Sequence, residues 1–121
     1  MTQKNILIVE DYEDNQILLM HLLNSENLEI TFASDGVEAL NQLNRHTYDL
    51  IFLDLNLPDL DGFEVSKMIR ERGFKNPIIA FTASSTDETY KNAIHSGCND
   101  LLLKSFHIHK IKSCLQKYLY P

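Results

Sequence analysis

Short apolar runs alternate with amphipathic stretches along the whole chain. Several of these runs contain apolar side chains only, which is typical of strands that are buried on both faces of a parallel sheet. Together with their flanking residues, the runs predict strands at 5–9, 29–33, 50–53, 77–81 and 101–103.

The amphipathic stretches predict helices that follow each strand. Apolar residues at three- and four-residue spacing indicate helices at about 13–24, 36–46 and 63–72, a fourth that ends at Gly97, and a fifth from about residue 108. We expect Met20 and Met68 to fill the core. In the first helix, the expected apolar face consists of Ile17, Leu18, Met20, His21 and Leu22.

Helix-capping residues mark several boundaries. Capping boxes are indicated by Asp35 with Glu38, Asp61 with Glu64, and Ser85 with Glu88, and C-terminal caps by Gly73 and Gly97. Strands and helices that alternate in this way predict an α/β fold, a doubly wound parallel sheet with helices on both faces. The 121 residues suit a single domain spanning 1–121.

Polar side chains follow the apolar runs directly. Glu10 and Asp11 follow the first strand, Asp54 the third, Thr82 the fourth and Lys104 the fifth. The carboxyl ends of parallel strands lie at one edge of a sheet, where open α/β proteins bind their ligands. We therefore expect three carboxylates, a hydroxyl and an ammonium group to converge there.

Composition narrows the possible functions. The formal net charge of −6 argues against nucleic acid as a direct partner and suits a site that concentrates carboxylates around a cation. No apolar run approaches the roughly 20 residues of a membrane span, and no signal segment is evident. Cys98 and Cys114 are expected to be free and buried. We expect a cytoplasmic protein without a membrane anchor.

Five motifs, four of which contain the strand-end residues, resemble the receiver domain of two-component response regulators, and the resemblance covers the whole chain. The motifs are IVED at 8–11, SDGVEAL at 34–40, DLIFLDLNLPDLDG at 49–62, PIIAFTA at 77–83 and GCNDLLLK at 97–104. The resemblance implies a flavodoxin-like fold with five helices and the strand order 2-1-3-4-5.

The resemblance also implies a role for each site residue. Asp54 would accept a phosphoryl group, with Lys104 and Thr82 holding the phosphoryl oxygens. Mg²⁺, which prefers hard oxygen ligands, would neutralise the charge on both reactants, and Mn²⁺ could substitute. Its implied ligands are Asp11, Asp54, the carbonyl of Asn56 and, through water, Glu10.

By the same resemblance the domain is a switch and not a turnover enzyme. The phosphodonor would be a histidine kinase or a histidine phosphotransfer protein. Phosphorylation would move Thr82 and remodel the face formed by the fourth helix, the fifth strand and the fifth helix, which would bind a downstream protein. The domain is expected to be a monomer or a weak, phosphorylation-dependent dimer.

Three positions depart from the common receiver pattern. Glu10 replaces the usual Asp, and Leu101 stands where many receivers have a switching aromatic residue. Ser105 replaces the proline that normally follows the lysine in a cis peptide. Because a non-proline cis bond costs about 2.5–4 kcal/mol, we expect a trans Lys104–Ser105 bond.

Other readings of the sequence stay open. A stand-alone regulator is the leading reading, but Asp14, Asn15 and Gln16 before an apolar helix look similar to receivers of hybrid kinases. A degenerate receiver could act as an unphosphorylated docking module. Two further classes of protein are disfavoured. A haloacid-dehalogenase-type phosphatase would need a second Asp where Asn56 stands, and a nucleotide-binding domain would need a glycine-rich phosphate loop, which does not follow any of the strands.

Overall fold

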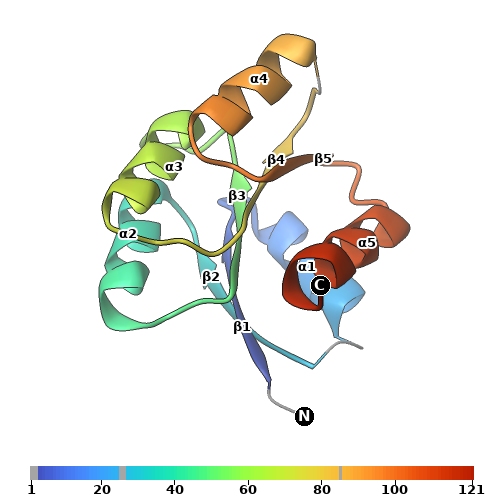
Figure 1. Cartoon of the computed structure of the whole chain (residues 1–121). Helices are drawn as coiled ribbons and strands as arrows, with labels where there is room; N and C mark the ends of the chain where they lie inside the picture. The colour runs from blue at the N-terminus through green and yellow to red at the C-terminus, as the bar shows by residue number, and fades with distance from the viewer. Residues whose placement is uncertain (1–2, 25–26, 85) are drawn as a thin grey trace.

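The computed structural model describes residues 3–24, 27–84 and 86–121, and it confirms the predicted α/β fold. Within this part of the chain, five parallel strands form one sheet in the order β2-β1-β3-β4-β5, the order that the resemblance implied (Figure 1). Each strand lies within one residue of its expected bounds. The strands are β1 (Lys4–Val9), β2 (Leu28–Ala33), β3 (Leu50–Asp54), β4 (Ile78–Thr82) and β5 (Asp100–Leu103).

Helices cover both faces of the sheet. α1 (Glu13–Leu23) and α5 (Ile108–Leu119) lie on one face, and α2 (Gly36–Arg45), α3 (Gly62–Glu71) and α4 (Asp87–His95) on the other (Figure 1). The chain reverses its direction across the sheet between β1 and β3, so the carboxyl ends of these two strands form the crevice in which such folds bind ligands. Among the described residues, no helix has the length and apolar character needed to cross a bilayer.

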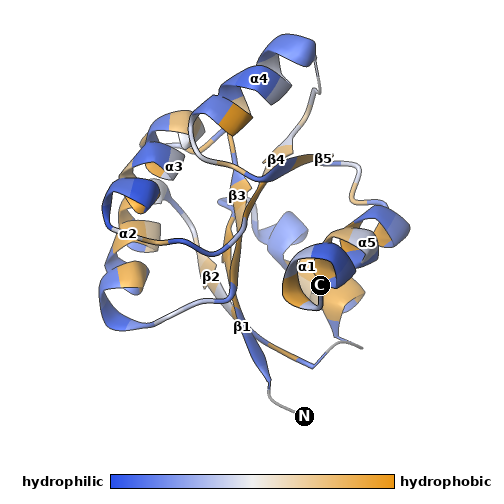
Figure 2. Cartoon of the chain, in the orientation of Figure 1, coloured by the Kyte–Doolittle hydropathy of each residue, from blue (hydrophilic) through white to orange (hydrophobic). Residues whose placement is uncertain are grey.

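Alternate side chains of the strands fill a core on each face of the sheet. Ile6 and Ile8 of β1 pack under α1 and α5, whereas Leu7 and Val9 pack under α2, α3 and α4. All four side chains are fully buried. Figure 2 shows apolar residues along the sheet and polar residues on the outward-facing turns of the helices. Burial on both faces explains why β1, β3 and β4 contain unbroken apolar runs, whereas the edge strand β2 includes polar residues.

Asp35 and Asp61 cap α2 and α3 as predicted, but the glutamates of the two predicted capping boxes make other contacts, since the Glu64 carboxylate pairs with Lys67. Asp35 Oδ1 accepts a hydrogen bond from the N–H of Glu38 at 2.8 Å, and Asp61 Oδ1 accepts one from the N–H of Phe63 at 2.8 Å. The Glu38 carboxylate accepts from the N–H of Ser34 at 3.1 Å. Glu38 therefore reaches one residue further back than a standard capping box requires.

The boundaries of α4 differ from the prediction. Ser85, the predicted cap, lies outside the described residues. Thr86 caps the helix, because its Oγ1 accepts a hydrogen bond from the N–H of Thr89 at 3.1 Å. Gly73 and Gly97 follow α3 and α4 with φ angles of 92° and 110°, as predicted for C-terminal glycine caps.

The prediction for the apolar face of α1 was largely wrong, because Leu22 alone of the expected residues packs against the core. The helix packs on the sheet through Leu19 and Leu23, which are one turn apart and buried. Apolar residues surround this helix almost completely, so their spacing alone could not single out the packed face. Met68 on α3 is also exposed and not in the core. The exposed apolar side chains of α1 are Ile17 (61%), Leu18 (42%) and Met20 (43%).

Candidate functional site

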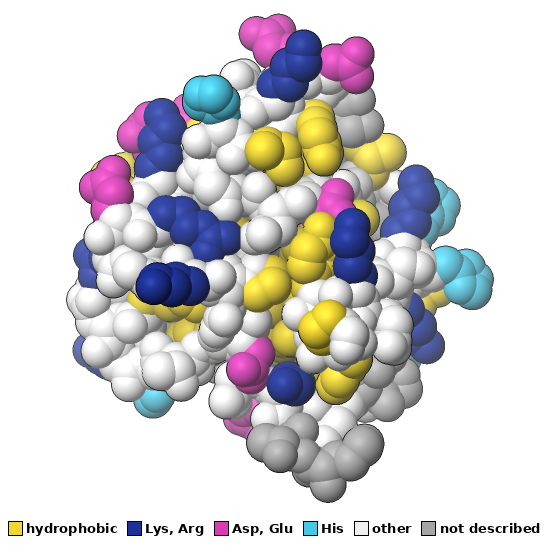
Figure 3. Space-filling view, in the orientation of Figure 1, with side chains coloured by type: hydrophobic (Ala, Val, Ile, Leu, Met, Phe, Trp, Pro, Cys, Tyr) yellow, Lys and Arg dark blue, Asp and Glu magenta, His cyan; other side chains and the backbone are white. Residues whose placement is uncertain are grey.

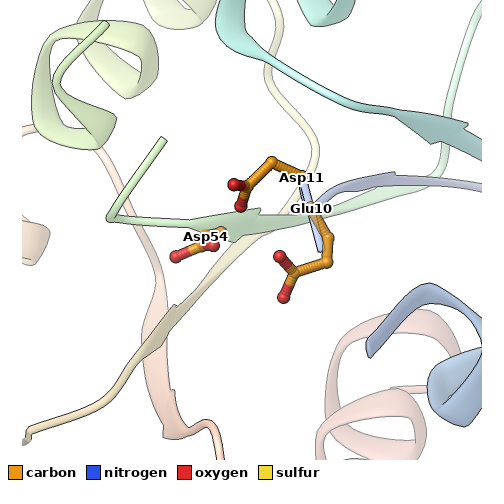
Figure 4. A group of neighbouring side chains, drawn as sticks. All are labelled: Glu10, Asp11 and Asp54. Atoms are coloured by element: carbon orange, nitrogen blue, oxygen red, sulfur yellow. The ribbon is translucent and has the colours of Figure 1, made fainter. Parts of the chain in front are cut away.

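Three carboxylates meet where β1 and β3 end. Val9 of β1 pairs with Leu53 of β3, so the residues that follow them, Glu10 and Asp54, lie at the same level of the sheet. Carboxylate oxygens of Glu10, Asp11 and Asp54 all lie within 4.8 Å of one another (Figure 4). Hard oxygen donors grouped in this way fit a divalent cation such as Mg²⁺. The predicted convergence of the acidic residues is therefore found.

Lys104 reaches this cluster from the end of β5. Its Nζ lies 2.7 Å from Asp54 Oδ2 and 3.9 Å from Glu10 Oε1. The N–H of Lys104 also donates a hydrogen bond to the carbonyl of Thr82 at 2.8 Å, which ties the end of β5 to the end of β4. Asp54 is fully buried, and the ammonium group compensates the charge that would otherwise be costly there.

Glu10 is buried as well and is held by the start of α1. Its Oε2 accepts a hydrogen bond from the N–H of Tyr12 at 3.1 Å, and its Oε1 accepts one from the side-chain amide of Asn15 at 3.0 Å. Burial raises the pKa of Glu10, and the charge of Asp54 acts in the same direction against the opposing effect of these hydrogen bonds and of Lys104. A bound cation would favour the ionised carboxylate.

Thr82 stands at the end of β4, next to the strand that carries Asp54, and is buried. Its hydroxyl donates to the carbonyl of Ser84 at 3.0 Å, and the N–H of Ser84 approaches Thr82 Oγ1 at 3.3 Å. The hydroxyl is thus bonded to its own loop. To bind a group on Asp54, it would have to exchange the bond to Ser84 for a new one.

Asn56 lies two residues beyond Asp54 in the turn that follows β3. Its N–H donates a hydrogen bond to Asp54 Oδ1 at 2.8 Å, and its backbone forms an isolated antiparallel bridge with Asp61. Both carboxylate oxygens of Asp54 are therefore engaged, one by this N–H and one by Lys104. The bridge fixes the turn that carries the Asn56 carbonyl, the implied third metal ligand.

Asp59 ties this turn to the start of α2. Its two carboxylate oxygens accept hydrogen bonds from the N–H groups of Gly36 at 2.9 Å and Val37 at 3.0 Å. Desolvation raises the pKa of Asp59, but these N–H donors and that of Leu60 outweigh it, so the pKa is lowered. Asp59 therefore caps α2, a helix that lies earlier in the chain, and the sequence did not indicate this contact.

The structure shows the local conformation at Ser105 and Leu101, two of the positions that depart from the receiver pattern. The Lys104–Ser105 peptide bond is trans, as predicted. Phe106 takes a positive φ of 50°, and its buried ring packs edge-on against Phe81 at a centroid distance of 4.9 Å. Leu101 is partly buried against the core under α2, α3 and α4.

A sequence profile described as "Response regulator receiver domain" matches residues 6–116. The chain belongs to this family. A receiver domain is a phosphoacceptor signalling module rather than an ordinary enzyme, and it implies a histidine kinase as the source of phosphoryl groups.

The chain is similar to receiver segments of large kinases and to one short protein. It is 37% identical to the osmosensing histidine protein kinase SLN1 of Saccharomyces cerevisiae over 97% of this chain and 10% of SLN1. It is 34% identical to the sensor histidine kinase RcsC of Escherichia coli, over 93% of this chain and 12% of RcsC. An uncharacterised 14.6 kDa protein of Leptolyngbya boryana is 35% identical over 98% of this chain and 92% of its own length.

Solved receiver structures superpose closely on this domain. The receiver domain of the sensor histidine kinase PA1611 from Pseudomonas aeruginosa has a TM-score of 0.87 and 33% identity, with coverage of 99% of this chain and 100% of that one. In that receiver domain a magnesium ion is coordinated in the active-site cleft. A receiver domain of a Francisella response regulator has a TM-score of 0.89 and 27% identity, with 96% coverage of both chains.

Sequence reasoning did not assign Asn15 and Gln16 to the site. Both side chains contact Glu10, because the amide of Gln16 donates to the Glu10 carbonyl at 2.6 Å and that of Asn15 to the carboxylate. The sequence offered one signal for this contact, because Asn15 and Gln16 are amide side chains in the first turn of the helix that follows the acidic pair Glu10 and Asp11. That signal is weak, since polar residues at the start of a helix usually face solvent.

Proposed function

We propose that this receiver domain accepts a phosphoryl group on Asp54 from a phosphohistidine of a histidine kinase or a histidine phosphotransfer protein. The observation that carries the proposal is the buried Asp54 carboxylate, which binds Lys104 at 2.7 Å and lies beside Glu10 and Asp11. A buried carboxylate that pairs with a lysine and lies beside two further carboxylates is not needed to hold the fold together. It suits a nucleophile that must be shielded and oriented.

Each residue of the site has a defined task in this transfer. Asp54 attacks the phosphorus, the bond from phosphorus to the donor nitrogen breaks, and the donor histidine takes up a proton from solvent. Asp11, Asp54 and the Asn56 carbonyl, with Glu10 through water, would hold Mg²⁺, which would neutralise the negative charge on the two reactants. Lys104 moves from Asp54 to a phosphoryl oxygen, and the Thr82 hydroxyl donates to another.

The same site removes the phosphoryl group. Water attacks the phosphorus of the acyl phosphate, inorganic phosphate leaves, and the Asp54 carboxylate is restored. While the phosphoryl group is bound, Thr82 no longer donates to Ser84, and the loop between β4 and α4 shifts. That shift changes the face formed by α4, β5 and α5, which binds a downstream protein.

We infer that residues 1–121 form one receiver domain and act as a stand-alone regulator. The relative from Leptolyngbya boryana supports this reading, because this chain aligns with 92% of its length. The alternative is a receiver segment of a hybrid kinase, favoured by the similarity to SLN1 and RcsC. Detection of the native polypeptide with an antibody distinguishes the two: a band near 14.0 kDa supports the stand-alone regulator, and a much larger band overturns it.

Intact mass spectrometry after incubation with acetyl phosphate tests the transfer. We expect a single phosphoryl adduct that requires Mg²⁺ and is stable to acid but labile to alkali. Asp54→Ala should abolish the adduct. Asp49→Ala should retain it, because Asp49 precedes the opposite end of the same strand. An equal yield of adduct in Asp54→Ala, or no adduct in the wild type with Mg²⁺, would contradict the proposal.

A further inference from the structure

Asn15, in the first turn of α1, is hydrogen-bonded to the Glu10 carboxylate. Its Nδ2 donates to Glu10 Oε1 at 3.0 Å, while the N–H of Tyr12 donates to Oε2 at 3.1 Å. Each carboxylate oxygen thus has a donor from the start of α1. In Figure 4 the Glu10 side chain points away from that of Asp11, although oxygens of both lie within 4.8 Å of each other.

Glu10 has a competing partner within reach. The oxygen that Asn15 holds, Oε1, is also 3.9 Å from Nζ of Lys104, which is bonded to Asp54 at 2.7 Å. A lysine ammonium is a compact charge on a flexible stem, so it can pair with any free carboxylate that the stem reaches. Without the Asn15 donor, Glu10 Oε1 would be free to pair with Lys104. That pairing would draw the ammonium away from Asp54.

The length of Glu10 makes such an anchor necessary. A glutamate has one more rotatable bond than an aspartate, so fixing it costs more side-chain entropy. Glu10 is only 1% exposed, and a buried carboxylate without hydrogen bonds would be strongly disfavoured. The Tyr12 donor is a backbone group and is set by the start of the helix. The Asn15 amide is therefore the side-chain contribution from α1 that a substitution can remove.

We propose that Asn15 is a positioning residue for the metal site: it holds Glu10 as an acceptor for metal-bound water and keeps Glu10 away from Lys104. The proposal rests on the proposed function, since it concerns how Glu10 serves the Mg²⁺ that phosphoryl transfer requires. It assigns a task to a residue outside the carboxylate cluster. Partners of this kind orient metal ligands, and their loss typically weakens metal binding by about 10- to 100-fold.

Titration calorimetry with Mg²⁺ on the unphosphorylated domain tests the proposal. Asn15→Leu removes the amide donor with little change in shape, and we expect the dissociation constant to rise by about tenfold, the lower end of that range. Asn41→Leu makes the same change at an exposed position of α2 and should bind Mg²⁺ like the wild type. Urea unfolding without metal reports separately on stability.

Together with the wild type and Asn15→Leu, Glu10→Gln and the double variant Glu10→Gln/Asn15→Leu form a double-mutant cycle, in which the Mg²⁺ affinity of all four proteins is compared. If Asn15 acts through Glu10, its replacement has no further effect on Mg²⁺ affinity once Glu10 has been changed. An unchanged dissociation constant in Asn15→Leu, or an equal loss in the Glu10→Gln background, would overturn the inference. If Asn15→Leu does not fold, Asn15→Ser is measured instead. A wild type that binds no Mg²⁺ would refute the proposed function itself, so the two failures are distinguishable.

Discussion

Lys104 Nζ lies 2.7 Å from Oδ2 of Asp54, although Asp54 ends β3, Lys104 follows β5, and β4 lies between these two strands. The carboxylate is fully buried and the lysine side chain is 23% exposed. Removing one partner of such a pair leaves an uncompensated buried charge.

We therefore expect Lys104→Met to lower the free energy of unfolding by about 3 kcal/mol in the absence of metal. Urea unfolding measures the loss. The double variant Lys104→Met/Asp54→Asn should be more stable than Lys104→Met, because it no longer buries an unpaired charge. A double variant as unstable as Lys104→Met would show that packing of the lysine stem, and not the charge pair, causes the loss.

The raised pKa of Glu10 predicts how the stability of the metal-free domain depends on pH. Burial raises this pKa above its ordinary value of 4.5, so the folded state keeps the proton to a higher pH than the unfolded state does. Between the two pKa values the folded state binds more protons, and stability falls as pH rises through that window.

Glu10→Gln should remove this contribution, and the variant should be more stable than the wild type at neutral pH without metal. Urea unfolding from about pH 5 to about pH 8 measures the difference in slope. Glu29→Gln, at an exposed position of β2, is the control and should keep the wild-type slope. If the free energy of unfolding falls more steeply with pH in Glu10→Gln than in the wild type, the raised pKa of Glu10 is contradicted.

Asn56 and Ser84 are exposed, and their N–H groups contact Asp54 and Thr82. We expect their side chains to flank the path by which water would reach a phosphoryl group on Asp54. Asn56→Met and Ser84→Met place apolar bulk beside this path, and we expect each to slow dephosphorylation by about tenfold, equal to about 1.4 kcal/mol in the barrier. Because exposed substitutions rarely change stability by more than about 0.5 kcal/mol, unfolding should change little. Loss of the adduct over time, followed by intact mass, measures the rate. Wild-type rates in both variants would refute the prediction.

Gly62 begins α3 where the helix touches the strand that carries Asp54. A Cβ at this position would lie 2.4 Å from the Cα of Leu55, so backbone would have to move. We expect Gly62→Ala to destabilise the domain by about 3 kcal/mol, the upper range for overpacking. Gly73→Asn is the matched contrast, because Gly73 has open space around it and a φ that Asn tolerates. Equal losses in urea unfolding for the two variants would show that the close approach is not the cause.

Much of the fold and of the acidic site could be predicted because both depend on local sequence. Unbroken apolar runs define strands that are buried on both faces, and the residues that follow the runs are brought to one edge by the parallel sheet. Glu10, Asp11, Asp54 and Lys104 converge for this reason. Local hydrogen bonds likewise made the caps at Asp35 and Asp61 predictable.

The features that depend on packing between distant segments could not be predicted. Leu19 and Leu23 form the packed face of α1, in a core that the helix shares with the sheet and with α5. The nearly continuous apolar surface of α1 leaves this choice undetermined. Asp59 caps a helix that precedes it in the chain. The contact of Asn15 with Glu10 depends on how α1 starts after β1, and sequence spacing does not report that geometry.

Chemical trapping of the phosphorylated residue tests the role of Asp54 most directly. Borohydride reduces an acyl phosphate to an alcohol, so aspartyl phosphate becomes homoserine, whereas a phosphate on serine, threonine or histidine gives no such product. After incubation with acetyl phosphate and Mg²⁺, reduction and peptide mass spectrometry should find homoserine at position 54 and aspartate at positions 11 and 59. Homoserine at another aspartate position, or aspartate alone at position 54 in a sample that carries the adduct, would contradict the account.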